Sequence, residues 1–271
     1  SLIDFRIVSR TWAQKNRTEK VQDLKNREET YAARNANGTG AFIIRSWAPD
    51  QRIVMEKNPA WWDKASGNVD EVIFTPIRQD ATRIAALLSG EVDLVTDPPP
   101  QDVARLRQNP ALTLQDGPEA RTVFIGMDQF SEELAGSSVK GKNPFKDKRV
   151  RQAFYQAIDI DGIKKTVMRG ASNPSALMVG PGINGFDASV KRLPYDPAAA
   201  KKLMADAGYP DGFEVAMNCP NDRYVNDGRI CQAVAANLAR INVKIKLLAE
   251  TKGTYFPKVL RRDTSFYMLG W

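Results

Sequence analysis

In the last third of the chain, short apolar runs alternate with segments that predict helices. Strands are expected at 213–218, 243–249 and 265–269, and helices at 225–240 and 255–262. This alternation predicts two βαβ crossovers and a parallel sheet that is covered by helices. The pattern therefore predicts an α/β fold.

The first half of the chain predicts a β-hairpin and a further strand. The hairpin strands are expected at 41–47 and 52–56, and the next strand at 69–77. A turn at 37–40 separates them from a polar stretch, 13–37, which predicts a surface helix or loop.

Capping residues and glycines indicate the helices of the central part. One helix is expected from its N-cap Asp80 to just before Gly90. Three more helices are expected to begin at the caps Asp147, Asp161 and Asp196, and the last two of them to end at Gly170 and Gly208. The first of the three has an apolar inner face made of Val150, Ala153, Phe154, Ala157 and Ile158. The other expected elements are a helix at 103–108, strands at 92–95, 111–114 and 122–127, and a linker or long surface loop at 130–144.

The carboxyl ends of the predicted parallel strands indicate where a ligand would bind. In open α/β sheets, ligands occupy the crevice beyond these ends. The rule nominates the segments 219–225, 250–255 and 270–271. Trp271 lies at the edge of this predicted cleft, although a terminal residue could equally be frayed.

One nominated segment, 221–227, has the side chains of a binding loop. Asn221 and Asp222 are suited to bind amines and amides, and Arg223 is suited to bind a carboxylate. Tyr224 could stack on a ligand. The alternative is a loop that only caps the following helix, with Asn226 or Asp227 as the cap. Both interpretations remain open from the residues alone.

Composition removes several classes of chemistry. The chain has no histidine, which excludes Ser-His-Asp and Cys-His catalysis and histidine-ligated metal sites. No other catalytic constellation is visible, so no catalytic residue, cofactor or metal ligand is assigned, and a hydrolase without histidine is the alternative. The apolar runs are far shorter than the roughly 20 residues needed to span a bilayer.

The charge balance is basic. The formal net charge is +7 and the pI is about 9.4, which leaves a nucleic-acid-binding protein as a second alternative. The basic residues are scattered, and Asp147 interrupts their densest cluster at 146–151. A mildly basic surface without nucleic-acid binding is therefore preferred.

Cysteines and the first residues bear on the compartment. Cys219 and Cys231 form no CxxC motif, so they are expected either to close one disulfide or to be two small buried residues. The first residues, 1–5, lack the features of a signal peptide. The chain is thus expected to be cytosolic, already processed, or part of a longer protein.

Five blocks of sequence resemble the family 5 extracellular solute-binding proteins, which are the oligopeptide, dipeptide and nickel receptors of bacterial ABC importers. The blocks begin with GTGAFIIRSWAPDQRIVMEKNPAWW and end with SFYMLGW; in the order of the family they are 38–62, 69–95, 143–163, 195–213 and 265–271. The resemblance implies a two-lobed, type II periplasmic-binding-protein-like receptor with mixed or parallel sheets flanked by helices. Residues 1–127 would belong to the C-terminal portion of lobe I, and 128–271 to a lobe II that is truncated at its C-terminal side.

The resemblance also implies a function. The protein would be a monomeric, non-enzymatic receptor that captures a peptide or similar polar solute between its lobes and delivers it to the importer's membrane subunits. It would be exported to the periplasm, with a signal peptide outside this chain, and an oxidising compartment favours the disulfide between Cys219 and Cys231.

Particular ligand contacts follow from the resemblance. Trp271 would line the pocket, Tyr255 and Phe256 would form an apolar wall, and Arg223 and Asp222 would pair with a carboxylate and an ammonium. The hinge and pocket floor would be formed by Met127 and Asp128. The chain departs from the family in three ways. Its length is about half that of family members, and it lacks the acidic residue that follows the Gly-Trp pair in family peptide receptors. It also has Met268 where some peptide receptors have arginine.

Overall fold

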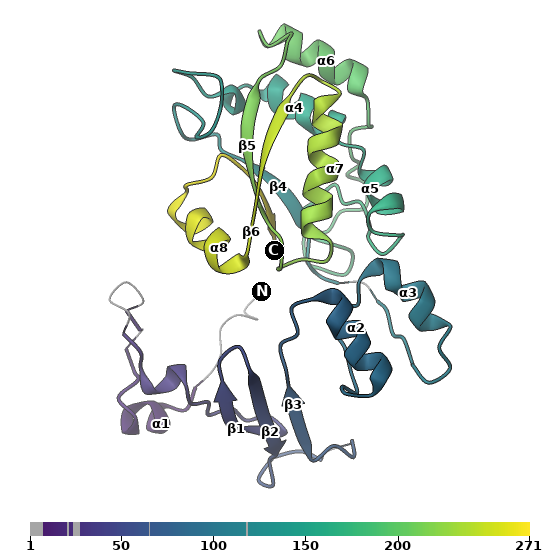
Figure 1. The fold of residues 1–271 in the computed structure, drawn as a ribbon. Helices are drawn as coiled ribbons and strands as arrows, with labels where there is room; N and C mark the ends of the chain where they lie inside the picture. The colour runs from purple at the N-terminus through teal and green to yellow at the C-terminus, as the bar shows by residue number, and fades with distance from the viewer. Residues whose placement is uncertain (1–7, 21, 24–27, 65, 118) are drawn as a thin grey trace. The chain divides into compact units, whose positions relative to one another are not determined.

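The computed structural model describes residues 8–271 except 21, 24–27, 65 and 118. The chain divides between Arg83 and Ile84 into two units, which are described separately (Figure 1). The lobe boundary expected at 127/128 is a different division, and it stays a prediction.

A three-stranded antiparallel sheet is the main element of the first unit. It has the order β1 (Phe42–Ala48), β2 (Arg52–Lys57) and β3 (Glu71–Phe74), and a bulge interrupts β1 between Ile44 and Ser46. The predicted hairpin is confirmed, and the third strand is shorter than expected. The polar stretch before it holds a short helix, α1 (Arg10–Lys15), and a 3₁₀ turn at Tyr31–Ala33.

The second unit contains a mixed four-stranded sheet. Its order is β4 (Val123–Met127), β7 (Phe266–Gly270), β5 (Glu214–Pro220) and β6 (Lys244–Glu250). Strands β5, β6 and β7 are parallel, whereas β4 is antiparallel to β7. The helices α7 (Asp227–Ala239) and α8 (Lys252–Arg261) connect the parallel strands, so both predicted βαβ crossovers are confirmed (Figure 1).

Aspartate caps begin the helices that lie between β4 and β5. Helix α4 (Lys148–Ala157) is capped by Asp147, and α6 (Pro197–Asp206) by Asp196, as expected; each carboxylate accepts a backbone N–H at 2.8 Å. The cap predicted for α5 (Ile160–Thr166) is wrong. Asp159 accepts the N–H of Gly162 at 2.8 Å, and Asp161 lies inside the first turn. Asp159, two residues earlier, has non-helical backbone angles (φ −76°, ψ 84°), as a cap requires, whereas Asp161 is already helical.

Four phenylalanines form the centre of the second unit's core. The ring of Phe145 lies 5.2 Å from that of Phe154 and 5.7 Å from that of Phe266, and Phe154 stacks on Phe213 at 5.9 Å. The predicted inner face of α4 supplies Phe154 together with the fully buried Val150, Ala153 and Ala157. Aromatic burial of this kind contributes a large share of a small core's stability.

Two strand predictions are wrong, whereas the segment 130–144 is a long surface loop up to Asn143, one of the two forms expected. Residues 92–95 and 111–114 form no strand, because no neighbouring strand pairs with them; they adjoin α2 (Asp80–Ser89) and α3 (Pro100–Arg107). Asp80 is itself the first residue of α2, not a cap before it.

The segment expected to be a linker packs along β5. The N–H of Ala216 donates to the carbonyl of Gly136 at 2.9 Å, and the N–H of Glu214 donates to Ser138 Oγ at 2.9 Å. Gly136 has φ +69°, and a Cβ there would lie 2.6 Å from the Cβ of Ala216. The glycine thus allows the close approach, and the segment serves as a partner for the first half of β5.

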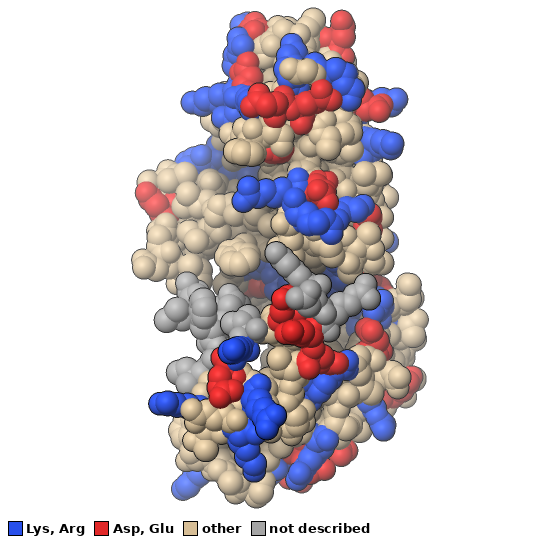
Figure 2. Space-filling view, turned by 90° about the vertical axis from the view of Figure 1, so that its left-hand side faces the viewer, with Lys and Arg blue, Asp and Glu red and all other residues tan. Residues whose placement is uncertain are grey.

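Two surface properties complete the description. Within the part of the chain that the structure describes, every helix is too short or too polar to cross a membrane. On the face shown in Figure 2, Lys and Arg are interspersed with Asp and Glu, so that face offers no continuous basic stripe to a phosphate backbone.

Candidate functional site

The three segments nominated from the sequence meet at the carboxyl edge of the second unit's sheet. The N–H of Asn221 donates to the carbonyl of Glu250 at 3.0 Å, which joins the ends of β5 and β6. The N–H of Gly270 donates to Tyr224 Oη at 2.8 Å, which joins the ends of β5 and β7. The edge predicted by topology is therefore one continuous surface, called here the carboxyl edge.

A fourth segment joins this edge because β4 is antiparallel. Thr122 and Trp271 exchange two backbone hydrogen bonds, at 2.8 and 3.0 Å, so the backbone of Trp271 is held in the ladder while its side chain is 80% exposed. Arg121 lies beside them with its guanidinium 6.0 Å from the ring centre of Tyr224. Sequence reasoning missed Arg121, since only the direction of β4 brings it here.

Asp227 fixes the backbone of the loop 221–227. Its carboxylate accepts the N–H groups of Arg223 at 2.9 Å, Tyr224 at 3.0 Å and Gly228 at 2.8 Å. Burial raises the pKa of Asp227; the three hydrogen bonds oppose this effect, and the charge of Asp222 adds to it. Asn226 occupies the N-cap position of α7 but forms no side-chain cap hydrogen bond, and its side chain donates to the carbonyl of Val167 at 2.9 Å. Asp227 is the first residue of α7 and not its N-cap, so neither predicted cap is confirmed.

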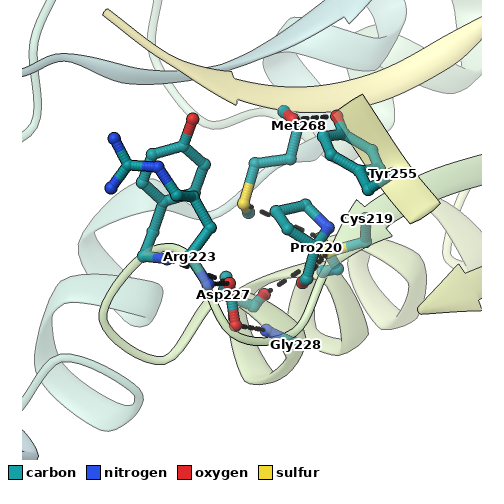
Figure 3. Close-up of a disulfide and its surroundings, with 9 residues drawn as sticks. Cys219, Pro220, Arg223, Asp227, Gly228, Tyr255 and Met268 are labelled. Atoms are coloured by element: carbon teal, nitrogen blue, oxygen red, sulfur yellow. Dashed lines mark hydrogen bonds between the residues drawn. A yellow bond between two sulfur atoms is a disulfide. The ribbon is translucent and has the colours of Figure 1, made fainter. Parts of the chain in front are cut away.

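A disulfide supports the same loop from below the surface. Cys219, near the end of β5, is bonded to Cys231 in α7, and both are completely buried (Figure 3). The sulfur of Cys231 lies 3.9 Å from that of Met268 in β7. The bond thus ties the strand that precedes the loop to the helix that follows it.

The hydrogen bonds of Asp227 leave other side chains of the loop available. Arg223 is exposed with its guanidinium 5.0 Å from the ring centre of Tyr224, and within the described residues it forms no ion pair. The carboxylate of Asp222 accepts the N–H of Lys252, the first residue of α8, at 2.6 Å through Oδ1. Asn221 is exposed. The loop therefore combines a backbone held by Asp227 with polar side chains at its surface.

The aromatic residues of the predicted site differ in exposure. Tyr224 is buried, and its hydroxyl is bonded to Gly270. Tyr255 is completely buried, donates its hydroxyl to the carbonyl of Met268, and has its pKa raised by burial. Phe256 is half-buried, with its ring 5.4 Å from that of Tyr255. Both tyrosines therefore pack the edge from within, and their contact with a ligand stays a prediction.

Met127 and Asp128 lie at the other end of β4. Met127 pairs with Phe266, four positions from the pair between Val123 and Gly270, which separates it from the carboxyl edge by about 13 Å. The carboxylate of Asp128 accepts the N–H of Phe130 at 2.8 Å. Burial raises the pKa of Asp128, but the hydrogen bonds with Ser131 and Phe130 together lower it by more, so the pKa lies below its ordinary value. The sheet therefore does not bring these two residues together with Trp271.

Outside the carboxyl edge, the described part of the chain forms an open hollow but no metal-binding cluster. Among the described residues, no three His, Cys, Asp or Glu side chains are close enough to hold a metal ion. An open hollow of about 430 Å³ lies along α5, lined by Asp161, Lys164, Lys165, Arg169 and Gly170, and it shares no residue with the carboxyl edge.

Comparison with known proteins assigns the chain to a protein family. The model of the bacterial extracellular solute-binding proteins, family 5 Middle, matches residues 7–271. The dipeptide-binding protein of Escherichia coli (strain K12) is 26% identical over 240 residues, which are 88% of this chain and 43% of that protein. Heme-binding protein A of Haemophilus influenzae is 27% identical over 242 residues, 86% of this chain and 41% of that protein.

A solved structure of a periplasmic binding protein has a similar fold. The periplasmic binding protein DppA from Helicobacter pylori, in complex with the peptide STSA, has a TM-score of 0.75 at 26% identity, over 98% of this chain and 48% of that one. The predicted fold, an α/β receptor of the type II periplasmic binding protein class, is confirmed, and the chain spans less than half the length of these relatives. The chain belongs to the family 5 bacterial extracellular solute-binding proteins.

Proposed function

We propose that the complete protein is a receptor that captures a small peptide or a similar polar solute and delivers it to the membrane subunits of an ABC importer. The carboxyl edge supports the proposal most directly. The loop 221–227, whose backbone is hydrogen-bonded to Asp227, carries the exposed Arg223 and the half-buried Asp222, and the exposed Trp271 follows β7 at the same edge. A guanidinium binds a carboxylate, a carboxylate binds an ammonium, and an indole covers an apolar group. These are the chemical groups of a peptide.

The relatives named above are binding proteins, and this supports capture without chemical change of the ligand. In such a receptor the ligand stabilises a closed arrangement of two lobes by binding it more strongly than the open one. Residues 1–127 and 128–271 are proposed to belong to the two lobes, with Met127 and Asp128 at the crossing between them. The periplasm is the proposed compartment, because receptors of this family work outside the cytoplasmic membrane. A monomer is the proposed oligomeric state.

Native mass spectrometry of the complete protein, purified from its own cells, tests this function. A bound small molecule that is released intact on denaturation, and identified by fragmentation, is the expected result. Absence of any adduct, together with no thermal shift from pools of peptides, would contradict the proposal. Incubation with the released molecule checks that it is not turned over.

Two substitutions test the edge itself. Replacing Arg223 or Trp271 by alanine in the complete protein should weaken binding at least tenfold, which corresponds to about 1.4 kcal/mol. The matched control is Arg261→Ala on α8, which removes an arginine whose partner is Asp263 and not a residue of the edge. Unchanged affinity in both edge variants would show that the ligand binds elsewhere.

A further inference from the structure

The charged side chains of the carboxyl edge differ in whether they already have a partner. Arg121 is paired with Glu119 at 3.0 Å, and Glu250 is paired with Lys258 of α8. Asp227 is only 4% exposed and is occupied by three backbone N–H groups. The two ion pairs neutralise their own charges, and the carboxylate of Asp227 is buried and already hydrogen-bonded, so none of these groups is open to a ligand.

Two cationic side chains and one carboxylate of the carboxyl edge remain open to a ligand. Arg223 and Lys252 are exposed, and neither forms an ion pair with any residue that the structure describes. Asp222 accepts the N–H of Lys252 with Oδ1, at 2.6 Å, and its second oxygen has no hydrogen-bond partner within the same described set. The groups open to a ligand therefore sum to one uncompensated positive charge.

Lys252 is placed to act with Arg223. It is the first residue of α8 and follows the end of β6 by two positions. Its backbone is fixed against the binding loop by the hydrogen bond to Asp222, the neighbour of Arg223. Side chains in a helix tilt toward the helix N-terminus, and for the first residue of α8 this direction leads back toward the carboxyl edge.

A ligand that covers this edge removes water from these charges. An isolated charge without a partner is costly once it is desolvated, so each one needs an opposite charge on the ligand. If Asp222 pairs with an ammonium and Arg223 with a carboxylate, the ammonium of Lys252 remains. A second acidic group on the ligand would pair with this ammonium.

We propose that the ligand is an acidic zwitterion with one ammonium and two carboxylates, such as a short peptide with an aspartate or glutamate residue, and that Lys252 binds the second carboxylate. This inference rests on the proposed function as a receptor. It adds Lys252 as a residue that determines specificity and narrows the solute to acidic members of its class.

The test uses the complete protein and a defined pool of dipeptides and tripeptides in which every Asp- or Glu-containing member has an Asn or Gln counterpart of the same shape. Retained peptides are separated from free peptides by gel filtration, released by denaturation and quantified by mass spectrometry. The acidic members should be retained at least fivefold more than their amide counterparts. In Lys252→Met the two should be retained equally.

Lys201→Met is the control, since it removes an exposed lysine from α6 and should preserve the preference for acidic peptides. Equal retention of acidic and amide members by the unaltered protein would overturn the inference while leaving the receptor function intact. A preference that survives in Lys252→Met would overturn the role of that residue. No retained peptide of any kind would instead contradict the proposed peptide receptor, and the inference with it.

Discussion

Removal of the Cys219–Cys231 disulfide is the most quantitative test of how the binding loop is held. The bond joins residues 12 positions apart and therefore closes a short loop in the unfolded chain. The chain-entropy relation assigns such a loop about 3 kcal/mol of stability at 25 °C. Both sulfur atoms are fully buried, and each is comparable with a methylene group worth about 0.8 kcal/mol. The Cys219→Ala/Cys231→Ala variant should thus lose about 4 to 5 kcal/mol.

Guanidinium unfolding of the complete, ligand-free protein, followed by circular dichroism, measures this loss. The unaltered protein is measured with and without a reductant that acts on the unfolded chain. Reduction should lower its free energy of unfolding by about 3 kcal/mol, because reduction removes the loop constraint but keeps both sulfur atoms. The double variant should be insensitive to the reductant, which makes it the internal control.

The reasoning would be refuted by a variant within 1 kcal/mol of the unaltered protein, combined with no effect of reduction. Such a result would mean that the bond does not form in solution or that the unfolded chain retains this loop. Ligand affinity provides a second measure. The disulfide connects β5 to α7 on both sides of the loop, so the double variant should bind its ligand more weakly, mainly through faster dissociation.

Three further predictions concern single residues. Phe154→Ala should cost about 3 to 5 kcal/mol, measured by denaturant unfolding, because the ring is fully buried among other phenylalanines. Gly270→Ala should weaken ligand binding and lower the melting temperature, because a Cβ there would lie 2.7 Å from the ring of Tyr224. Asp147→Ala should cost about 1 kcal/mol at pH 7 through loss of the α4 cap. The hydrogen bond from the side chain of Arg149 lowers the pKa of Asp147 despite the opposing effect of burial, so this contribution is present above the ordinary aspartate pKa and is lost as the pH falls through the lowered folded-state value.

Matched substitutions control these predictions. Phe154→Leu keeps most of the buried volume and should cost less than the alanine change. Gly253→Ala, where an added Cβ meets nothing within 4 Å, should leave binding unchanged and should not lower the melting temperature, because alanine favours the helix. Asp147→Asn keeps the cap without the charge, so its stability should vary less with pH than that of the unaltered protein. A cost for Asp147→Ala that stays constant down to pH 2 would contradict the assignment of the cap to the ionised carboxylate.

Predictions that rest on short-range patterns agree with the structure for the hairpin and for two of the four aspartate caps, whereas Asp80 and Asp161 lie inside the helices that they were expected to cap. The helix after Asp147 and the helix after Asp196 begin where an aspartate precedes apolar residues of helical spacing. The hairpin of β1 and β2 follows from two apolar runs around a turn. These features depend on residues within a few positions of each other, so the sequence contains all that decides them.

Predictions fail where distant residues compete. The apolar run at 92–95 forms no strand because the structure provides no partner for it. The segment around Gly136 is polar and rich in glycine, yet it pairs with the first half of β5, on the side where β7 pairs only farther along the strand, at Asn218. Composition predicts a flexible linker there, and only the arrangement of strands shows the pairing.

The candidate site divides in the same way. The sequence determined by itself that β5, β6 and β7 alternate with helices, and hence that the residues after each strand, including Asp222 and Trp271, would meet at one edge. Only the tertiary structure decided the direction of β4, which brings Arg121 to that edge and takes Met127 away from it. It also decided that Tyr255 is buried while Arg223 is free. The physical reason is that periodicity and capping act between neighbours in the chain, whereas strand direction, burial and charge pairing depend on which distant segments pack together.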